Sequence, residues 1–176
     1  MNQLNLTALV DKGKQEYEKG NYLAAADLFS QAAQSFASVQ DSLNAAEMKN
    51  NQSVALLQAG NAKEALQATE GTEDVFQKTG DIKRQGIAVS NRAAALEGLK
   101  KWKEALAEYN RAAALFEQIG EGDMHSIVRK AAADINLRHG RIAASQMDVF
   151  DSLRLVEKPT LSQRIMKFLM RIGLVR

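Results

Sequence analysis

Apolar residues recur along residues 22–39 at the spacing of one face of an α-helix. Small alanines alternate with aromatic residues on this face, and polar residues occupy the positions between them. A period of about 3.6 residues predicts an amphipathic helix. The alternation of large and small side chains would let a neighbouring helix approach closely. The residues on this face are Tyr22, Ala25, Ala26, Phe29, Ala32, Ala33, Phe36 and Val39.

The same pattern returns at a shift of 40 residues, which indicates a tandem repeat. The register predicts four units, at about residues 2–41, 42–81, 82–121 and 122–157, each with two helices. The aligned positions are Gly20, Gly60, Lys100 and Gly140; Tyr22, Ala62, Trp102 and Ile142; Ala25, Ala65, Ala105 and Ser145; Phe29, Thr69, Tyr109 and Val149; and Phe36, Phe76, Phe116 and Val156.

Glycines mark the ends of the predicted helices. A residue in the left-handed conformation commonly ends a helix, and glycine adopts it without a Cβ penalty. Lys100 occupies this position in the third unit. The loops between helices are expected to have only two or three residues. Gly20, Gly60 and Gly140 end first helices, Gly80 and Gly120 end second helices, and Asp41, Asp81 and Asp123 are expected as caps or first-turn acids.

The unit resembles the tetratricopeptide repeat, or TPR, which consists of two antiparallel helices. The stretches "YEKGNYLAAADLFSQAA" and "LKKWKEALAEYNRAAAL" both carry the family's series of turn, aromatic, Ala, aromatic and Ala. Thr69 and Thr72 depart from this series, and "RHGRIAASQMDVFDSL" departs as a terminal unit would. The resemblance covers residues 6–157 and implies an all-α, right-handed superhelical solenoid. Its core is expected to include Tyr22, Phe29, Trp102, Tyr109 and Phe116.

Repeat proteins of this kind bind partners on the concave surface lined by their first helices. Asparagine is a poor helix former, so Asn50, Asn51 and Asn91 in mid-helix require an explanation. Their amides would either hydrogen-bond the backbone of a bound peptide or cap and bridge neighbouring helices. The predicted groove residues are Lys14, Tyr17, Asn50, Asn51, Val54, Ser90, Asn91, Lys130 and Asp134, with Val10, Leu57, Ala94 and Glu97 at further inward positions.

The segment "SNRAAALEGL" also resembles the repeats of chaperone adaptors that hold an acidic C-terminal peptide in a carboxylate clamp. Asn51 and Asn91 match asparagine or arginine positions of that clamp. Val10 stands where a lysine is expected, and Lys14 stands where an asparagine is expected. A chaperone-type acidic-peptide binder is therefore an alternative function.

The last residues, "KPTLSQRIMKFLMRIGLVR", form a separate segment, 158–176, after the repeat domain at 1–157. Pro159 separates the two, Thr160 is a suitable N-cap, and the segment has basic residues but no acidic one. It predicts an amphipathic helix that caps the fourth unit, lies on an anionic membrane or binds a partner. In the fourth unit, Ile135, Val149 and Leu153 require covering. The apolar stripe of the tail is Leu161, Ile165, Phe168, Leu169 and Ile172.

Composition narrows the function further. A net charge of +2 with mixed basic and acidic residues does not favour a nucleic-acid binder. The sequence contains no cysteine, which excludes disulfides and zinc sites with thiolate ligands. The absence of cysteine also fits a protein of the cytoplasm. His125 and His139 lack metal-ligand spacing, and "GEGDMHS" indicates a turn and helix start rather than a catalytic triad. No cofactor, no metal site and no enzymatic activity are expected.

Two functions remain from these observations. The first is a protein-interaction adaptor or scaffold that binds a peptide or helix in its concave groove. The second is a self-assembling structural module, a homo-oligomer in which the C-terminal helix makes the contact between molecules. Peripheral membrane contact through residues 160–176 is compatible with both.

Overall fold

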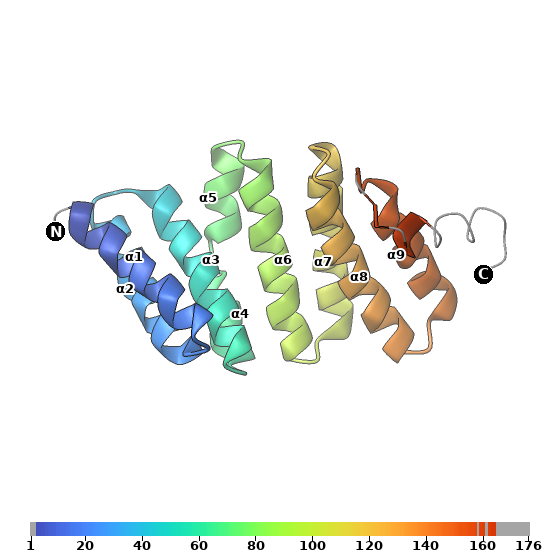
Figure 1. Cartoon of the computed structure of the whole chain (residues 1–176), viewed down its shortest axis with the longest axis horizontal. Coiled ribbons are helices and arrows are strands. Elements are labelled where there is room, and N and C mark those ends of the chain that lie inside the picture. Colours follow the sequence, from blue (N-terminus) through green and yellow to red (C-terminus); the bar gives the residue numbers. More distant parts are fainter. Residues whose placement is uncertain (1–2, 158, 161, 165–176) are drawn as a thin grey trace. The chain divides into compact units, whose positions relative to one another are not determined.

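The computed structural model describes residues 3–157, 159–160 and 162–164, with side chains from residue 6 onward. All regular elements in these ranges are α-helices, so the predicted all-α solenoid class is confirmed (Figure 1). The chain divides into two compact units, residues 1–105 and 106–176. The boundary between them lies in the first turn of helix α7, and each unit is described by itself.

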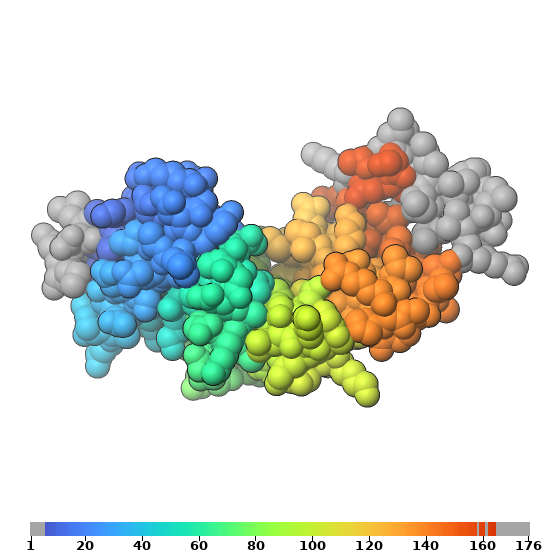
Figure 2. Space-filling view, turned by 90° about the horizontal axis from the view of Figure 1, so that it is seen from below, coloured from blue at the N-terminus to red at the C-terminus, as the bar shows by residue number. Residues whose placement is uncertain are grey.

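Unit 1 contains helices in the order helix, tight turn, helix, as the repeat pattern predicts. α1 packs on α2, α2 on α3, and α3 on α4, α5 and α6. The blue, teal and green atoms of these successive helices lie against one another in Figure 2. The helices are α1 (Gln3–Glu18), α2 (Tyr22–Ser38), α3 (Ser42–Gln58), α4 (Ala62–Ala68), α5 (Thr72–Lys78) and α6 (Ile82–Gly98).

Small residues at equivalent repeat positions bring the helices of a pair together. The alanine position of the second helix is buried in every repeat, at Ala25, Ala65, Ala105 and Ser145. On the facing first helix, a Cβ added to Gly13 would lie 2.8 Å from the Phe29 ring. In the next repeat, the buried Ser53 hydroxyl donates a 2.9 Å hydrogen bond to the Ala65 carbonyl.

The turns follow the same repeat. Positive φ angles occur every twenty residues, and two of these positions hold non-glycine residues, Gln40 and Lys100, each with φ of 60°. The carboxylate of Asp41 accepts a hydrogen bond from the Asn44 amide, and that of Asp81 accepts one from the Arg84 amide. The second bond lowers the pKa of Asp81. The other positive φ angles in this series are at Gly20, Gly60, Gly80, Gly120 and Gly140.

The aromatic core is smaller than the sequence predicts. Phe29, Tyr109 and Phe116 are buried as expected, whereas Tyr22 and Trp102 are only half-buried. Each of the latter two is the first residue of its helix, where the side chain lies at the end of the packed face rather than in its middle. The prediction that Tyr22 and Trp102 belong to the buried core is therefore wrong.

The second helix of the second repeat is broken. α4 ends at Ala68 and α5 begins at Thr72, with Gly71 between them at φ of 75°. Thr69 occupies the position held by Phe29 and Tyr109 in other repeats, and its hydroxyl donates to the Leu66 carbonyl at 2.7 Å. The Thr72 hydroxyl donates to the Thr69 carbonyl at 2.8 Å. Both threonines thus stabilise the break.

Unit 2 contains the rest of α7 (Trp102–Gln118), α8 (Gly122–Arg138) and α9 (Ile142–Arg154), and α9 packs along α8. Ile135 and Leu153 are buried, and Val149 is half-buried. The chain after α9 returns to the start of α8, where a Cβ on Gly122 would lie 2.2 Å from the Leu155 carbonyl oxygen. Only glycine fits this approach.

Candidate functional site

The predicted groove residues of unit 1 lie on its first helices. Lys14 and Tyr17 are on α1, and α3 packs against α6 in the same unit. The structure therefore brings the α3 and α6 positions onto neighbouring helices. These positions are Asn50, Asn51 and Val54 on α3 and Ser90 and Asn91 on α6.

Asn50 is the most deeply buried polar residue among the predicted groove positions. Only 4% of its surface is exposed. Its Oδ1 atom has no hydrogen-bond partner in the described part of the chain. A buried acceptor without a partner costs about 1–3 kcal/mol, so this carbonyl is an unsatisfied group on α3.

Asn51 and Asn91 are half-buried and recur at the same repeat position. Neither side-chain amide forms a hydrogen bond with another described residue. The alternative in which these amides cap or bridge neighbouring helices requires such bonds. The described residues therefore give no support to that alternative.

The remaining groove positions of unit 1 differ in their environment. Tyr17 packs edge-on against Tyr22, with ring centroids 5.2 Å apart, so its ring belongs to the packing of α1 on α2. Val54 is half-buried and Lys14 is exposed. The Ser90 hydroxyl donates to the Ile87 carbonyl at 2.8 Å, so this group is already satisfied within α6.

Lys130 and Asp134 lie on α8 in unit 2. Lys130 is exposed, and the Asp134 carboxylate pairs with Arg138 one turn further along the helix. Because they belong to unit 2, they are a separate part of the predicted site from the residues of unit 1.

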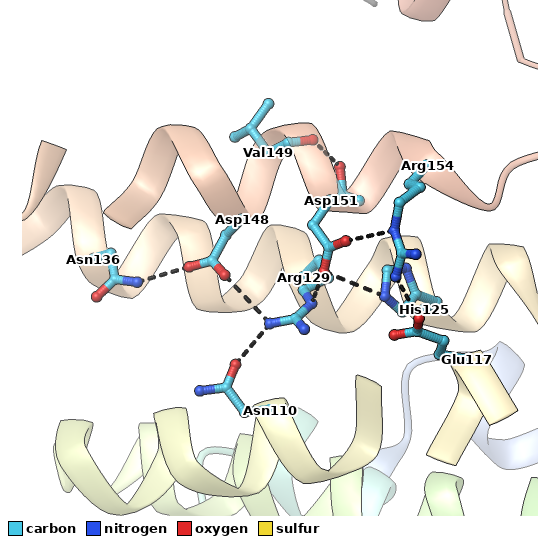
Figure 3. A network of polar contacts seen from close by, with 10 residues as sticks. Asn110, Glu117, His125, Arg129, Asn136, Asp148, Val149, Asp151 and Arg154 are labelled. Carbon is cyan, nitrogen blue, oxygen red and sulfur yellow. Dashed lines mark hydrogen bonds and ion pairs between the residues drawn. The ribbon is translucent and has the colours of Figure 1, made fainter. Parts of the chain in front are cut away.

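A network of charged residues joins α8 to α9, and it was not predicted from the sequence (Figure 3). Arg129 contacts Asp151 at 2.6 Å and Asp148 at 3.4 Å. Arg129 also donates to the side-chain Oδ1 atom of Asn110 on α7 at 2.8 Å. Asn136 donates to Asp148 at 2.7 Å. The charges are paired, so the network stabilises the α8–α9 pair and is not a free binding surface.

Arg154 extends this network to α7. Its guanidinium contacts Glu117 at 2.6 Å and Asp151 at 2.9 Å. These hydrogen bonds raise the pKa of Arg154, the one to Glu117 most strongly. Figure 3 shows Arg154 and Arg129 on either side of the Asp151 carboxylate. Two cations thus share one carboxylate.

His125 lies at the buried end of the network. Its side chain is fully buried, and neither ring nitrogen forms a hydrogen bond. Its Nε2 lies 3.5 Å from the Asp151 carboxylate. Burial lowers the pKa of His125, and the positive charges of Arg129 and Arg154 act in the same direction. His125 is therefore part of the packed interior of unit 2. α8 begins at Gly122, as the turn motif predicts.

A comparison with protein families decides the relationship. The sequence model of the soluble NSF attachment protein family, SNAP, matches residues 15–171, which is well over half of the chain. The chain belongs to the SNAP family. No curated protein sequence matches it.

The SNAP match refines the TPR resemblance. SNAP proteins are built from TPR-like helical repeats, so the helical repeat is confirmed, whereas the family shown is SNAP rather than TPR itself. SNAP proteins are non-enzymatic α-helical adaptors that bind protein partners. The matched range also extends beyond the repeats into the C-terminal segment.

No group of three or more His, Asp or Glu side chains in the described part of the chain could hold a metal ion. None of its helices combines the length and the apolar character that crossing a bilayer requires.

The C-terminal segment is described only at its start. The Gln163 amide donates to the Thr160 hydroxyl at 3.3 Å, and the Thr160 amide donates to the Gln163 side chain at 2.7 Å. This reciprocal pair is a capping box, which confirms Thr160 as an N-cap. The apolar stripe lies outside the described residues, at Leu161, Ile165, Phe168, Leu169 and Ile172, so the capping, membrane and partner hypotheses stay predictions.

One cavity of unit 1 was missed by the sequence reasoning. It lies between α2, α3 and the junction of α4 with α5. Thr69 and Thr72 depart from the repeat pattern in the sequence. This departure could have indicated the cavity, because the two residues mark the helix break that forms one of its walls.

Proposed function

We propose that this chain is a non-enzymatic adaptor that binds a peptide or helix of a protein partner along the first helices of its repeats. The observation that carries the proposal is the pair of unbonded amides at equivalent repeat positions, Asn51 and Asn91. The SNAP description, which names attachment of NSF, supports a protein as the partner.

The chemistry of the two amides suits a polypeptide ligand. Each carboxamide supplies two N–H donors and a carbonyl acceptor, so it can bond the backbone N–H and C=O groups of a bound chain regardless of sequence. Asparagine costs helix stability in mid-helix. Without an intramolecular bond to offset this cost, binding is the remaining reason for the residue type.

The neighbours of the amides supply an apolar and a charged component. Val54 lies one turn after Asn50 on α3 and is half-buried, so it can contact an apolar side chain of the partner. Lys14 on α1 is exposed and can contact an acidic one. The surface therefore favours a ligand with mixed character over a purely apolar one.

Replacement of both amides tests this proposal. Each lost neutral hydrogen bond is worth about 1 kcal/mol, so Asn51→Ala with Asn91→Ala should weaken partner binding by about tenfold to a hundredfold. The readout is the amount of native partner retained by the immobilised protein from source lysate. Far-UV circular dichroism should be unchanged.

The matched control removes two exposed amides from second helices of the same unit, Gln67→Ala with Gln77→Ala. This variant should retain the partner fully. Full retention by the Asn51 and Asn91 variant would instead place the binding surface elsewhere. Loss of binding by both variants would remove the argument for this face.

A further inference from the structure

A hollow of about 600 Å³ opens on unit 1 between α2, α3 and the α4–α5 junction. Small and apolar side chains form its floor, at Ala33, Ala37, Ala45, Ala46 and Val75. The volume lies within the range of about 300–1,000 Å³ that is usual for ligand pockets. The hollow is therefore large enough for one or two side chains of a ligand.

The helix break shapes this hollow. Glu70, Gly71 and Thr72, the residues of the break, form part of its lining. Gly71 adopts a positive φ, and open space surrounds the position of a Cβ there. The break in the second helix thus contributes part of the wall of the hollow.

The hollow lies on a different side of α3 from the amide groove. Its α3 residues Ala45, Lys49 and Gln52 form one stripe at i, i+4 and i+7. The amide groove uses a second stripe of α3 with the same spacing, at Asn50, Val54 and Leu57, which starts five residues later. Five residues correspond to a rotation of about 140° around the helix axis. The two surfaces can therefore act independently.

Polar groups without partners surround the floor. Gln34 and Gln52 on α2 and α3 make no hydrogen bond with any described residue. Lys49 and Glu70 lie on the rim, and neither forms an ion pair within the described part of the chain. The hollow thus combines an apolar floor, free amides and one charge of each sign.

We infer that this hollow binds an extended peptide segment of a protein partner. A helix satisfies its own backbone groups, whereas an extended segment presents N–H and C=O groups that the two glutamines can bond. Alternate side chains of an extended segment point to the same side. An apolar residue would lie on the alanine floor, with an acidic residue toward Lys49 and a basic residue toward Glu70.

Titration of the labelled protein with synthetic peptides, followed by NMR, tests this inference. The probe is a capped Glu-Thr-Leu-Thr-Lys peptide, in which the charged and apolar side chains share one side. It should give saturable shifts at the Gln34 and Gln52 side-chain amides and at Lys49. Replacement of its Leu by Ser should weaken binding at least tenfold.

Two protein variants and one control variant make the test specific. Ala37→Phe places a ring over the floor and should weaken binding at least tenfold, whereas Ala8→Phe, at another exposed alanine, should not. Lys49→Glu should weaken binding of the probe but improve binding of the Lys-Thr-Leu-Thr-Lys peptide relative to the parent protein. The second variant changes no packing, so it stays informative if Ala37→Phe is poorly folded.

Several outcomes would overturn the inference. These are absence of saturable shifts at the hollow, equal binding of the Leu and Ser peptides, or tighter binding of a helical peptide of the same composition. Asn51→Ala with Asn91→Ala should leave the probe's affinity unchanged, so failure here leaves the proposed adaptor groove untouched.

Discussion

Two residues in the turns carry side chains where the repeat otherwise uses glycine. Gln40 and Lys100 both have φ of 60°, and the equivalent turns hold glycine with φ between 69° and 83°. A left-handed conformation costs an L-residue about 1–2 kcal/mol because Cβ crowds the following carbonyl. The turns at these two positions therefore form at the expense of stability.

Lys100→Gly should stabilise the protein. Removal of the Cβ relieves the conformational cost, and the larger entropy of glycine in the unfolded chain offsets part of the gain. We expect a net increase of about 0.5–1 kcal/mol in the free energy of unfolding, measured by urea denaturation. Gly60→Ala, the reverse change at an equivalent turn, should destabilise. No gain from Lys100→Gly would mean that the lysine side chain stabilises the turn by other contacts.

At the residue scale, the sequence predicted those features that depend on local chemistry. The caps at Asp41 and Asp81 follow from residue type and position alone. The residue type of Lys100 does not indicate a left-handed turn, and only its position in the repeat register does. Trp102 was mispredicted because its aromatic character says nothing of how far along the packed face it lies. The unbonded state of Asn51 and Asn91 required the positions of all neighbouring side chains.

At the scale of the elements, the fourth repeat uses a different interaction from the others. Residues equivalent to Arg129 and Asn136 in the preceding repeat are Val89 and Leu96, which are buried. Ion pairs and hydrogen bonds join α8 to α9 instead. This explains why the repeat pattern is weak there, since sequence patterns report apolar packing and not charge pairing across helices.

The buried His125 makes the stability of this helix pair depend on pH. Burial lowers its folded pKa, so the folded state favours the neutral ring. Above the unfolded pKa of about 6.5, the ring is neutral in both states and the free energy of unfolding is not reduced by this group. As the pH falls from there toward the folded pKa, the free energy of unfolding decreases by up to about 1.4 kcal/mol per pH unit. The melting temperature should therefore decrease between pH 7.5 and pH 5.5.

His125→Gln isolates this effect, because Gln85 occupies the equivalent position in the preceding repeat and is buried there. The variant should lose most of the pH dependence. His139→Gln, at the exposed histidine, should retain it. An identical decrease in the parent protein and in His125→Gln would assign the pH dependence to other groups.

At the scale of the whole molecule, the repeat register was predictable and the division into units was not. The forty-residue period is visible because equivalent positions such as Ala25, Ala65 and Ala105 must all be small to let helices pack. The boundary near Ala105 depends on the density of contacts in space, which the period does not encode. The SNAP relationship likewise required comparison of the whole chain with a family.

Two surfaces of unit 1 follow from this architecture. The first helices carry the free amides, and the hollow beside the broken helix carries free amides and rim charges. An adaptor with two independent surfaces could hold two segments of one partner, which would raise the affinity through effective concentration. Of the two surfaces, the first helices carry the proposed adaptor function.

Site-specific photo-crosslinking tests whether a protein partner binds along these first helices. A photoreactive amino acid replaces Val54 on the amide face of α3 or, as the control, Gln67 on α4, and each protein is irradiated with its native partner in lysate. We predict a crosslinked partner from position 54 that disappears in the Asn51→Ala, Asn91→Ala background, and none from position 67. Crosslinking from position 67 alone, or only a product of twice the protein's own mass from position 54, would contradict the adaptor groove, the latter in favour of self-assembly.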